Sequence, residues 1–204
     1  MFPYILSLLV GYAVGSFPSA YVLVQWKSRV DIRTSGSGNV GTMNTFDVTG
    51  SKSLSIAVLL LDLLKGILAV LLARFLIDRA PWVESAAGIG AVLGHNYPVW
   101  LKFHGGRGLA AAAGVFAVIG WVFVPVWCLF WGLTYAPSKD IHTANVIATI
   151  VAPVVVWLVP DGGLSWSVAD GSLAAFRVTA LILCALIFIR HWDILPAILK
   201  SIQK

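Results

Sequence analysis

The stretch from Leu54 to Ile77, LSIAVLLLDLLKGILAVLLARFLI, decides the class of fold. It contains three charged residues and no proline. A helix of this length, at about 1.5 Å per residue, can cross the hydrocarbon core of a bilayer, which is about 30 Å thick. The stretch therefore predicts a transmembrane helix, and the rest of the chain must suit a protein embedded in lipid.

The composition of the whole chain agrees with this. The 204 residues are 59% hydrophobic and 11% charged, and the mean hydropathy is +0.89. A soluble domain is about 45–50% apolar and about 25% charged, and a soluble protein of this size could not bury so much apolar surface. These values exclude a soluble enzyme, a disordered protein and a nucleic-acid-binding module. We assign the net charge of +5 to contacts with anionic lipid.

The apolar segments predict an all-α, polytopic membrane protein that forms one domain over residues 1–204. Seven spans are expected, some of them short or broken, with the N-terminus outside and the C-terminus in the cytoplasm. The spans are Phe2–Gln25, Leu54–Ile77, Val83–Leu101, two short helices within Leu109–Tyr135 joined by a turn near Gly120–Val124, Ala144–Val159 and Leu173–Ile189. A single tilted helix over residues 109–135 is the alternative.

Basic residues favour the seven-span arrangement. It puts ten of them on the inner side and three, Arg74, Arg79 and Arg177, on the outer side, as the positive-inside rule requires. Six spans would give a weaker bias. The inner residues are Lys27, Arg29, Arg33, Lys52, Lys102, Arg107, Lys139, Arg190, Lys200 and Lys204.

Polar residues gather in the first inner segment, Asp31–Asn44, which reads DIRTSGSGNVGTMN. Its glycines allow a positive φ and a close approach of backbone to a ligand, and successive N–H groups in such a loop can form an anion-binding concavity. An ordinary glycine- and serine-rich turn is the alternative. The candidate ligands are Gly36, Ser37, Gly38, Asn39, Gly41 and Asn44.

The second inner segment, Gly94–Gly108, again combines glycines with hydrogen-bond donors. The guanidinium of Arg107 could bind a phosphate through two hydrogen bonds. Alternatively, Lys102 and Arg107 only anchor the helix ends at the membrane surface. The candidate ligands are His95, Lys102, Gly105, Gly106, Arg107 and Gly108.

Three further groups are considered. Asp62 and Lys65 lie three residues apart in the second span and so share a helix face. They form either a structural ion pair or part of a functional site. Arg190 and His191 follow the last span, where His191 could act as a general base or donate a hydrogen bond to a phosphate. We expect His104 and His142 to take no part.

No common nucleophile, metal-ligand or paired-carboxylate pattern occurs, so we expect neither a metal nor a cofactor. The sequence instead indicates a cationic, donor-rich site at the inner face of the membrane. Such a site suits a phosphorylated, partly lipidic substrate, with binding and charge stabilisation supplying most of the catalysis.

The inner segments resemble the bacterial acyl-phosphate:glycerol-3-phosphate acyltransferases, the PlsY-type family. The first family motif, Gly-Ser-Gly-Asn-x-Gly-Ala-Thr-Asn, is matched by residues 36–44. The second, Gly-His-x-x-Pro-Val-x-x-x-Phe-x-Gly-Gly-Lys-Gly, is matched by residues 94–108. The third, Arg-His-x-x-Asn, is met by Arg190 and His191 alone. The resemblance covers most of the chain.

This resemblance implies a seven-span enzyme of the bacterial inner membrane that needs no cofactor. It would transfer an acyl chain from acyl phosphate to the 1-hydroxyl of glycerol 3-phosphate, giving lysophosphatidic acid and phosphate for phospholipid synthesis. Ser37, Arg107 and His191 would be the catalytic residues at the phosphate site. The remaining candidates, including Lys65 and Arg190, would bind substrate.

Among the departures from the family pattern, four bear on the chemistry of the site. Asp47 stands where the family has an arginine, Ile194 where it has an asparagine, Met43 where it has a threonine, and Arg107 where it has a lysine. A carboxylate near a phosphate would repel it. Two alternatives follow: the same fold acting on a different acceptor, and a non-catalytic membrane protein that binds lipid or phosphate. If the acceptor is unchanged, another cation such as Arg29, Arg33, Lys102 or Arg190 must replace the lost arginine.

Overall fold

The regular structure is helical throughout the part of the chain that is described. The computed structural model describes residues 1–169 and 172–196, the side chain of Asp193 excepted. Within these residues there is no strand, and the one isolated β-bridge joins Gly120 to Val168. The prediction of an all-α protein is therefore confirmed.

Nine α-helices are found in this part of the chain, connected by short loops and 3₁₀ turns. Their bounds are α1 Phe2–Gly15, α2 Ser19–Ser28, α3 Thr42–Thr49, α4 Lys52–Leu76, α5 Pro81–Asn96, α6 Leu109–Ile119, α7 Phe123–Ser138, α8 Ile141–Leu158 and α9 Leu173–Ile189.

Proline and glycine set several of these boundaries. The chain breaks between α1 and α2 at Pro18, which begins the second helix as its N-cap. Helix α5 ends at Asn96, earlier than expected, because the residue before Pro98 disfavours helical backbone. Gly120 ends α6 beneath the ring of Phe176, which leaves no room for a Cβ. The turn predicted within residues 109–135 is confirmed, and the single tilted helix is wrong.

Three segments are long and apolar enough to cross a membrane. These are Phe2–Ser28, Lys52–Leu76 and Ile141–Leu158. Helices α6 and α9 are apolar but shorter. Large apolar side chains such as Leu60, Leu68 and Leu133 are exposed on the outside of the bundle, as expected of a protein surrounded by lipid rather than water.

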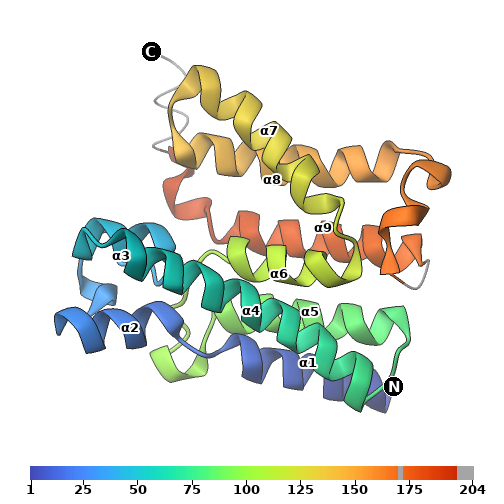
Figure 1. The fold of residues 1–204 in the computed structure, drawn as a ribbon, viewed down its shortest axis with the longest axis horizontal. Coiled ribbons are helices and arrows are strands. Elements are labelled where there is room, and N and C mark those ends of the chain that lie inside the picture. The colour runs from blue at the N-terminus through green and yellow to red at the C-terminus, as the bar shows by residue number, and fades with distance from the viewer. Residues whose placement is uncertain (170–171, 197–204) are drawn as a thin grey trace.

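The helices lie roughly alongside one another, so the connections gather at two ends of the bundle (Figure 1). One end carries the loops of residues 29–41 and 97–108, the α7–α8 turn and the chain after α9. We call it the loop end. The other end carries the N-terminus and the α4–α5, α6–α7 and α8–α9 connections. Lys200 and Lys204, which the sequence assigns to the inner side, lie outside the described residues.

Small residues let α1 and α5 pack closely, as helices in lipid often do. A Cβ on Gly11 or Gly15 of α1 would collide with a backbone carbonyl of α5, and one on Gly90 would collide with the carbonyl of Leu8. Gly11, Gly15, Gly90 and Gly94 therefore form a stripe of close contact between α1 and α5.

Replacing Gly90 with alanine should destabilise the bundle. The added methyl group meets the backbone of α1, and overpacking of this kind costs about 1–3 kcal/mol. Gly132→Ala in α7 is the matched control, since a Cβ there has no neighbour within 4 Å. Thermal unfolding in detergent should show a lower midpoint for Gly90→Ala only. Equal midpoints for the two variants would mean that the α1–α5 contact is looser than described.

Candidate functional site

The first loop is organised by one buried side chain, Asn44. Its Nδ2 lies 3.1 Å from the carbonyl oxygen of Ile32, 3.0 Å from that of Ser35 and 2.9 Å from that of Asn39. Its Oδ1 accepts the N–H of Ser37 at 2.8 Å. Asn44, predicted to bind substrate, is thus occupied in holding the loop in shape.

A charged pair begins the same loop. Arg33 Nη2 lies 2.7 Å from Asp31 Oδ2, and the backbone N–H of Arg33 also donates to this carboxylate. These hydrogen bonds hold the pKa of Asp31 below its usual value. The guanidinium of Arg33 also lies over the ring of Tyr21, so it is bound within the loop rather than placed at a cavity.

The second loop turns back on the end of α5. The N–H of Gly105 donates to the carbonyl of Asn96, and that of Gly106 donates to the carbonyl of His95. A Cβ on Gly106 would collide with His95 Nε2 and lie 2.9 Å from the carbonyl oxygen of Val40. Gly106 is therefore the point where the two glycine-rich loops meet.

Four N–H groups of the two glycine-rich loops are hydrogen-bonded within the protein and so are not available to a bound anion. The N–H groups of Ser37 and Gly38 bond within the first loop, to Asn44 and to the carbonyl of Ser35. Those of Gly105 and Gly106 bond to the end of α5. At these positions the glycines serve close packing rather than presenting free N–H groups.

The segment after α9 joins the second loop. Arg190 Nε donates to the carbonyl of Gly106 at 3.1 Å, and its Nη2 donates to the carbonyl of Gly105 at 3.0 Å. His191 is 1% exposed, and its Nδ1 lies 2.8 Å from the carbonyl oxygen of Ile187. Three segments far apart in the sequence thus assemble at the loop end.

A buried ionic cluster lies beneath the loops. Lys65 Nζ is 2.9 Å from Asp62 Oδ1 and 3.2 Å from the carbonyl oxygen of Phe17. His95 Nδ1 is 3.6 Å from the same carboxylate oxygen. Asp62, Lys65 and His95 are 2%, 6% and 7% exposed, so each charge needs a partner. Lys65 neutralises Asp62 and fixes α4 to the break between α1 and α2.

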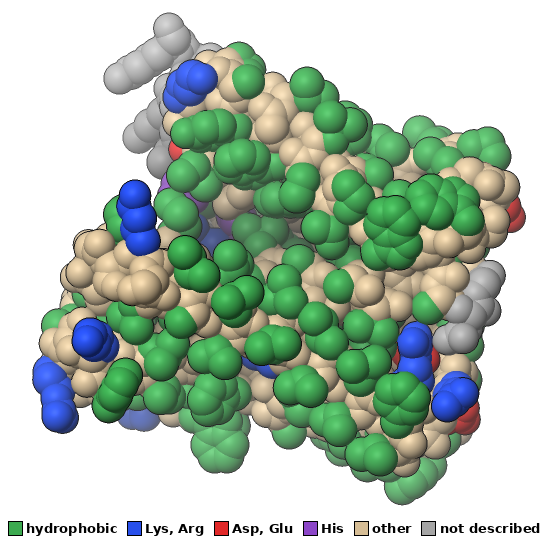
Figure 2. Space-filling view, in the orientation of Figure 1, with side chains coloured by type: hydrophobic (Ala, Val, Ile, Leu, Met, Phe, Trp, Pro, Cys, Tyr) green, Lys and Arg blue, Asp and Glu red, His purple; other side chains and the backbone are tan. Residues whose placement is uncertain are grey.

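A cavity of about 400 Å³ opens between these elements and the α7–α8 pair. In Figure 2 it is the hollow between the two halves of the molecule, with histidine and Lys or Arg side chains visible inside. Its wall is formed by Asn39, Gly41, Thr42, Met43, Leu59, Asp62, His95, Arg107, Gly108, Leu109, Ala110, Trp127, Trp131, Ile141, His142 and Asn145.

This wall includes some of the predicted site residues and leaves out others. Of the predicted catalytic residues, Arg107 lines the cavity, Ser37 is exposed on the adjoining loop, and His191 is buried at the end of α9. The predicted ligands on the wall are Asn39, Gly41, His95 and Gly108. Those not on the wall are Gly36, Gly38, Asn44, Lys65, Lys102, Gly105, Gly106 and Arg190.

The wall from α7 and α8 was missed by sequence reasoning. Trp131 Nε1 donates to Asn145 Oδ1 at 2.8 Å, and Trp127 Nε1 donates to Thr149 Oγ1 at 3.2 Å. His142, expected to take no part, lines the cavity. A signal was present, because polar residues at 142, 145 and 149 share one face of an otherwise apolar helix.

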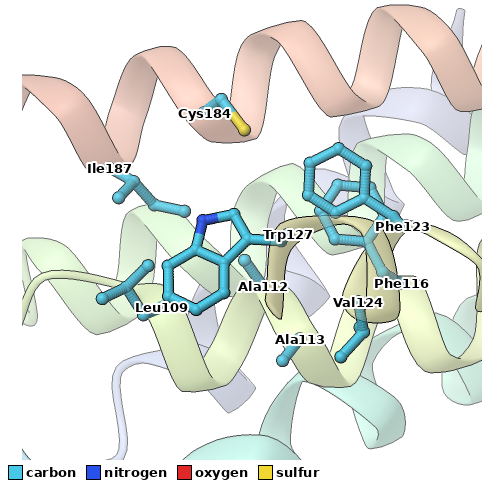
Figure 3. A pocket seen from close by; sticks show the side chains of 9 residues that line it. All are labelled: Leu109, Ala112, Ala113, Phe116, Phe123, Val124, Trp127, Cys184 and Ile187. Carbon is cyan, nitrogen blue, oxygen red and sulfur yellow. The ribbon is translucent and has the colours of Figure 1, made fainter. Parts of the chain in front are cut away.

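An apolar pocket adjoins this cavity and shares Leu109 and Trp127 with it (Figure 3). The pocket encloses about 40 Å³ and lies between α6, α7 and α9. The rings of Phe116 and Phe123 stack at one side of it, with their centroids 4.0 Å apart. A mainly apolar cavity that also presents Arg107, His142 and Asn145, with an apolar extension, can accommodate an amphiphilic molecule.

Fold and site together describe a helical membrane protein with a cavity lined by Arg107. The family model for glycerol-3-phosphate acyltransferase matches residues 5–201. The chain therefore belongs to the glycerol-3-phosphate acyltransferase family, and the resemblance noted in the sequence is confirmed.

Individual relatives agree. Glycerol-3-phosphate acyltransferase from Bradyrhizobium diazoefficiens is 40% identical over 151 residues, which cover 74% of this chain and 75% of the relative. That from Myxococcus xanthus is 44% identical over 145 residues, covering 71% and 73%. The crystal structure of PlsY, an integral membrane glycerol 3-phosphate acyltransferase, in its glycerol 3-phosphate form superposes with a TM-score of 0.79 at 31% identity, covering 97% of this chain and 92% of PlsY.

Replacing Asn44 with aspartate should open the first loop. The substitution removes both amide hydrogens and leaves a carboxylate facing three carbonyl oxygens, whose burial without donors is costly. Hydrogen exchange over residues 32–44 should become at least about tenfold faster. Asp47→Asn, an exposed change on the same helix, is the control and should exchange like the unmodified protein. Unchanged exchange in Asn44→Asp would show that the loop does not depend on this side chain.

Proposed function

We propose that this protein transfers an acyl chain from acyl phosphate to the 1-hydroxyl of glycerol 3-phosphate, giving lysophosphatidic acid and phosphate. The observation that carries the proposal is the pairing of a cavity lined by Arg107 with an apolar pocket that shares Leu109 and Trp127. The polar part suits phosphoryl groups, and the apolar part suits an acyl chain. The relatives are named glycerol-3-phosphate acyltransferases, which supports glycerol 3-phosphate as the acceptor.

The chemistry is acyl transfer between two oxygens. The hydroxyl oxygen of glycerol 3-phosphate attacks the acyl carbon, the bond from that carbon to the phosphate oxygen breaks, and the departing phosphate takes the hydroxyl proton. Because the departing phosphate itself accepts the proton, the step does not require a strong base from the protein. The protein holds the two substrates together and stabilises the phosphoryl charge, chiefly through Arg107.

The residues proposed for this role are those assigned from the sequence, with the geometry adding detail. Arg107 is proposed to contact the phosphoryl group; Ser37 on the first loop and His191 at the end of α9 are proposed to support it from outside the cavity wall. Asp47 is exposed on α3 and does not line the cavity. Its negative charge is therefore kept out of the cavity, which favours glycerol 3-phosphate over a different acceptor.

The proposed setting is the bacterial inner membrane, with seven spans, the loop end in the cytoplasm and the N-terminus outside. Helices α1 and α2 together form the first span, and α4 to α9 form the others. At the opposite end, Arg74 pairs with Glu84 and Arg177 pairs with Asp161. These ion pairs cancel positive charge there, which supports placing that end outside. The whole chain is proposed to form one domain.

Purified protein given acyl phosphate and glycerol 3-phosphate should release phosphate and form lysophosphatidic acid. Arg107→Gln should lower kcat/KM by roughly 10- to 100-fold, the effect of losing a charged hydrogen-bond donor. Lys27→Gln, exposed and off the cavity wall, is the control and should stay active. Phosphate release and mass spectrometry of the lipid product provide the measurements. Faster acylation of another acceptor would favour the same fold acting on a different acceptor. No turnover in folded protein would favour a non-catalytic membrane protein that binds lipid or phosphate.

The apolar pocket should set how well long acyl chains are used. Ala113→Leu fills the pocket, so kcat/KM for palmitoyl phosphate should fall by about tenfold while a short-chain acyl phosphate is affected less. Ala117→Leu is the matched control, one turn further along α6 and exposed. A similar loss for both chain lengths in Ala113→Leu would place the acyl chain elsewhere.

A further inference from the structure

The wall of the cavity holds a contact between two basic side chains. Arg107 Nη1 lies 3.4 Å from Nδ1 of His142. Arg107 comes from the loop before α6, and His142 from the first turn of α8. A guanidinium has only donors, so Nδ1 accepts in this contact. The imidazole is therefore neutral while it faces Arg107.

The cavity holds less positive charge than a phosphoryl group needs. Among the described residues on its wall, Arg107 is the only Lys or Arg. Arg33 is paired with Asp31, and Arg190 donates to the carbonyls of the second loop. Lys102 is exposed and off the wall. A phosphate monoester carries between one and two negative charges at neutral pH, so one guanidinium leaves part of this charge unmatched.

We propose that His142 is a second phosphoryl-binding residue, which takes up a proton from water when the phosphoryl group enters. The inference rests on the proposed function. The phosphoryl oxygens replace Nδ1 as acceptors of the Arg107 hydrogens. Nδ1 then binds the proton and donates it in a hydrogen bond to the same phosphoryl group. His142 thereby supplies positive charge only when the site is filled.

The groups around His142 allow this change. Asp140, the N-cap of α8, accepts the backbone N–H of His142 at 3.2 Å. Burial acts to raise the pKa of Asp140, but hydrogen bonds from Thr143 and His142 outweigh it and keep that pKa below its usual value. Across the cavity stand Asp62 and His95. On neighbouring α7, Lys139 at its end lies over the ring of Tyr135.

The balance of these charges shifts on binding. Arg107 and Asp140, which carry opposite charges, both lie close to His142. A phosphoryl dianion that enters beside the ring adds negative charge there, which favours the protonated imidazole.

Calorimetry tests this directly. Glycerol 3-phosphate is titrated into the protein at neutral pH in two buffers that differ in ionisation enthalpy. The unmodified protein should take up a substantial fraction of one proton per site. His142→Gln should take up almost none and bind about tenfold more weakly. His104→Gln is the control, since His104 is exposed and off the cavity wall, and it should match the unmodified protein.

A second variant distinguishes the loss of positive charge from misfolding. His142→Lys supplies a permanent charge, so it should retain more affinity than His142→Gln while taking up no proton. Steady-state kinetics of His142→Gln then show which phosphoryl group is bound: a rise in KM for glycerol 3-phosphate alone indicates the acceptor, and a rise for acyl phosphate indicates the donor. Proton uptake that persists in His142→Gln, or that is missing from the unmodified protein, would overturn the inference.

Failure of the proposed function would look different. In that case the unmodified, folded protein would turn over no acyl phosphate with glycerol 3-phosphate. Inorganic phosphate is then the probe for the same calorimetric comparison. If the unmodified protein binds phosphate with proton uptake and His142→Gln does not, the phosphoryl site is supported without the transferase activity. If His142→Gln still binds phosphate with proton uptake, the site is refuted.

Discussion

The guanidinium of Arg190, held between the carbonyl oxygens of Gly105 and Gly106, joins the end of α9 to the loop before α6. The N–H groups of the same two glycines bond to carbonyls at the end of α5. Irregular backbone near a membrane must satisfy its hydrogen bonds within the protein. Here one side chain and one helix end do so, and Arg107, next in the chain, is thereby placed on the cavity wall.

The same constraint explains the buried charges. Asp62 lies on the wall of a cavity proposed to bind phosphoryl groups, where an unpaired carboxylate would repel the ligand. Lys65 neutralises it from within α4, and Lys65 is itself fixed by the carbonyl of Phe17 at the break between α1 and α2. The break at Pro18 thus has a consequence for the site: it presents a carbonyl that a continuous helix would have used internally.

The sequence predicted what depends on local pattern. Apolar length identified the long helices but neither α3 nor the break between α1 and α2. Gly120 identified the turn between α6 and α7, and glycines with donors identified the two loops. It did not predict how those loops use their hydrogen bonds. Asn44 was taken as a ligand because its type suits binding, yet its amide holds the loop together. Whether a donor faces a ligand or its own backbone is decided by folding, not by residue type.

The α7–α8 wall shows the other limit. His142 and Asn145 lie on a helix that no motif marks, and they reach the site only because α8 packs beside α7 at the loop end. The departure from the family pattern at Asp47 also shows that residue type alone does not define the site. Asp47 lies on the exposed side of α3, so the cavity is spared its negative charge but also lacks a second arginine. A basic residue from α8 can meet that need because the cavity is bounded by elements on both sides, and charge can be supplied from either one. Binding chemistry in this fold is therefore a property of the cavity as a whole, because its wall combines residues from the glycine-rich loops with residues from α7 and α8.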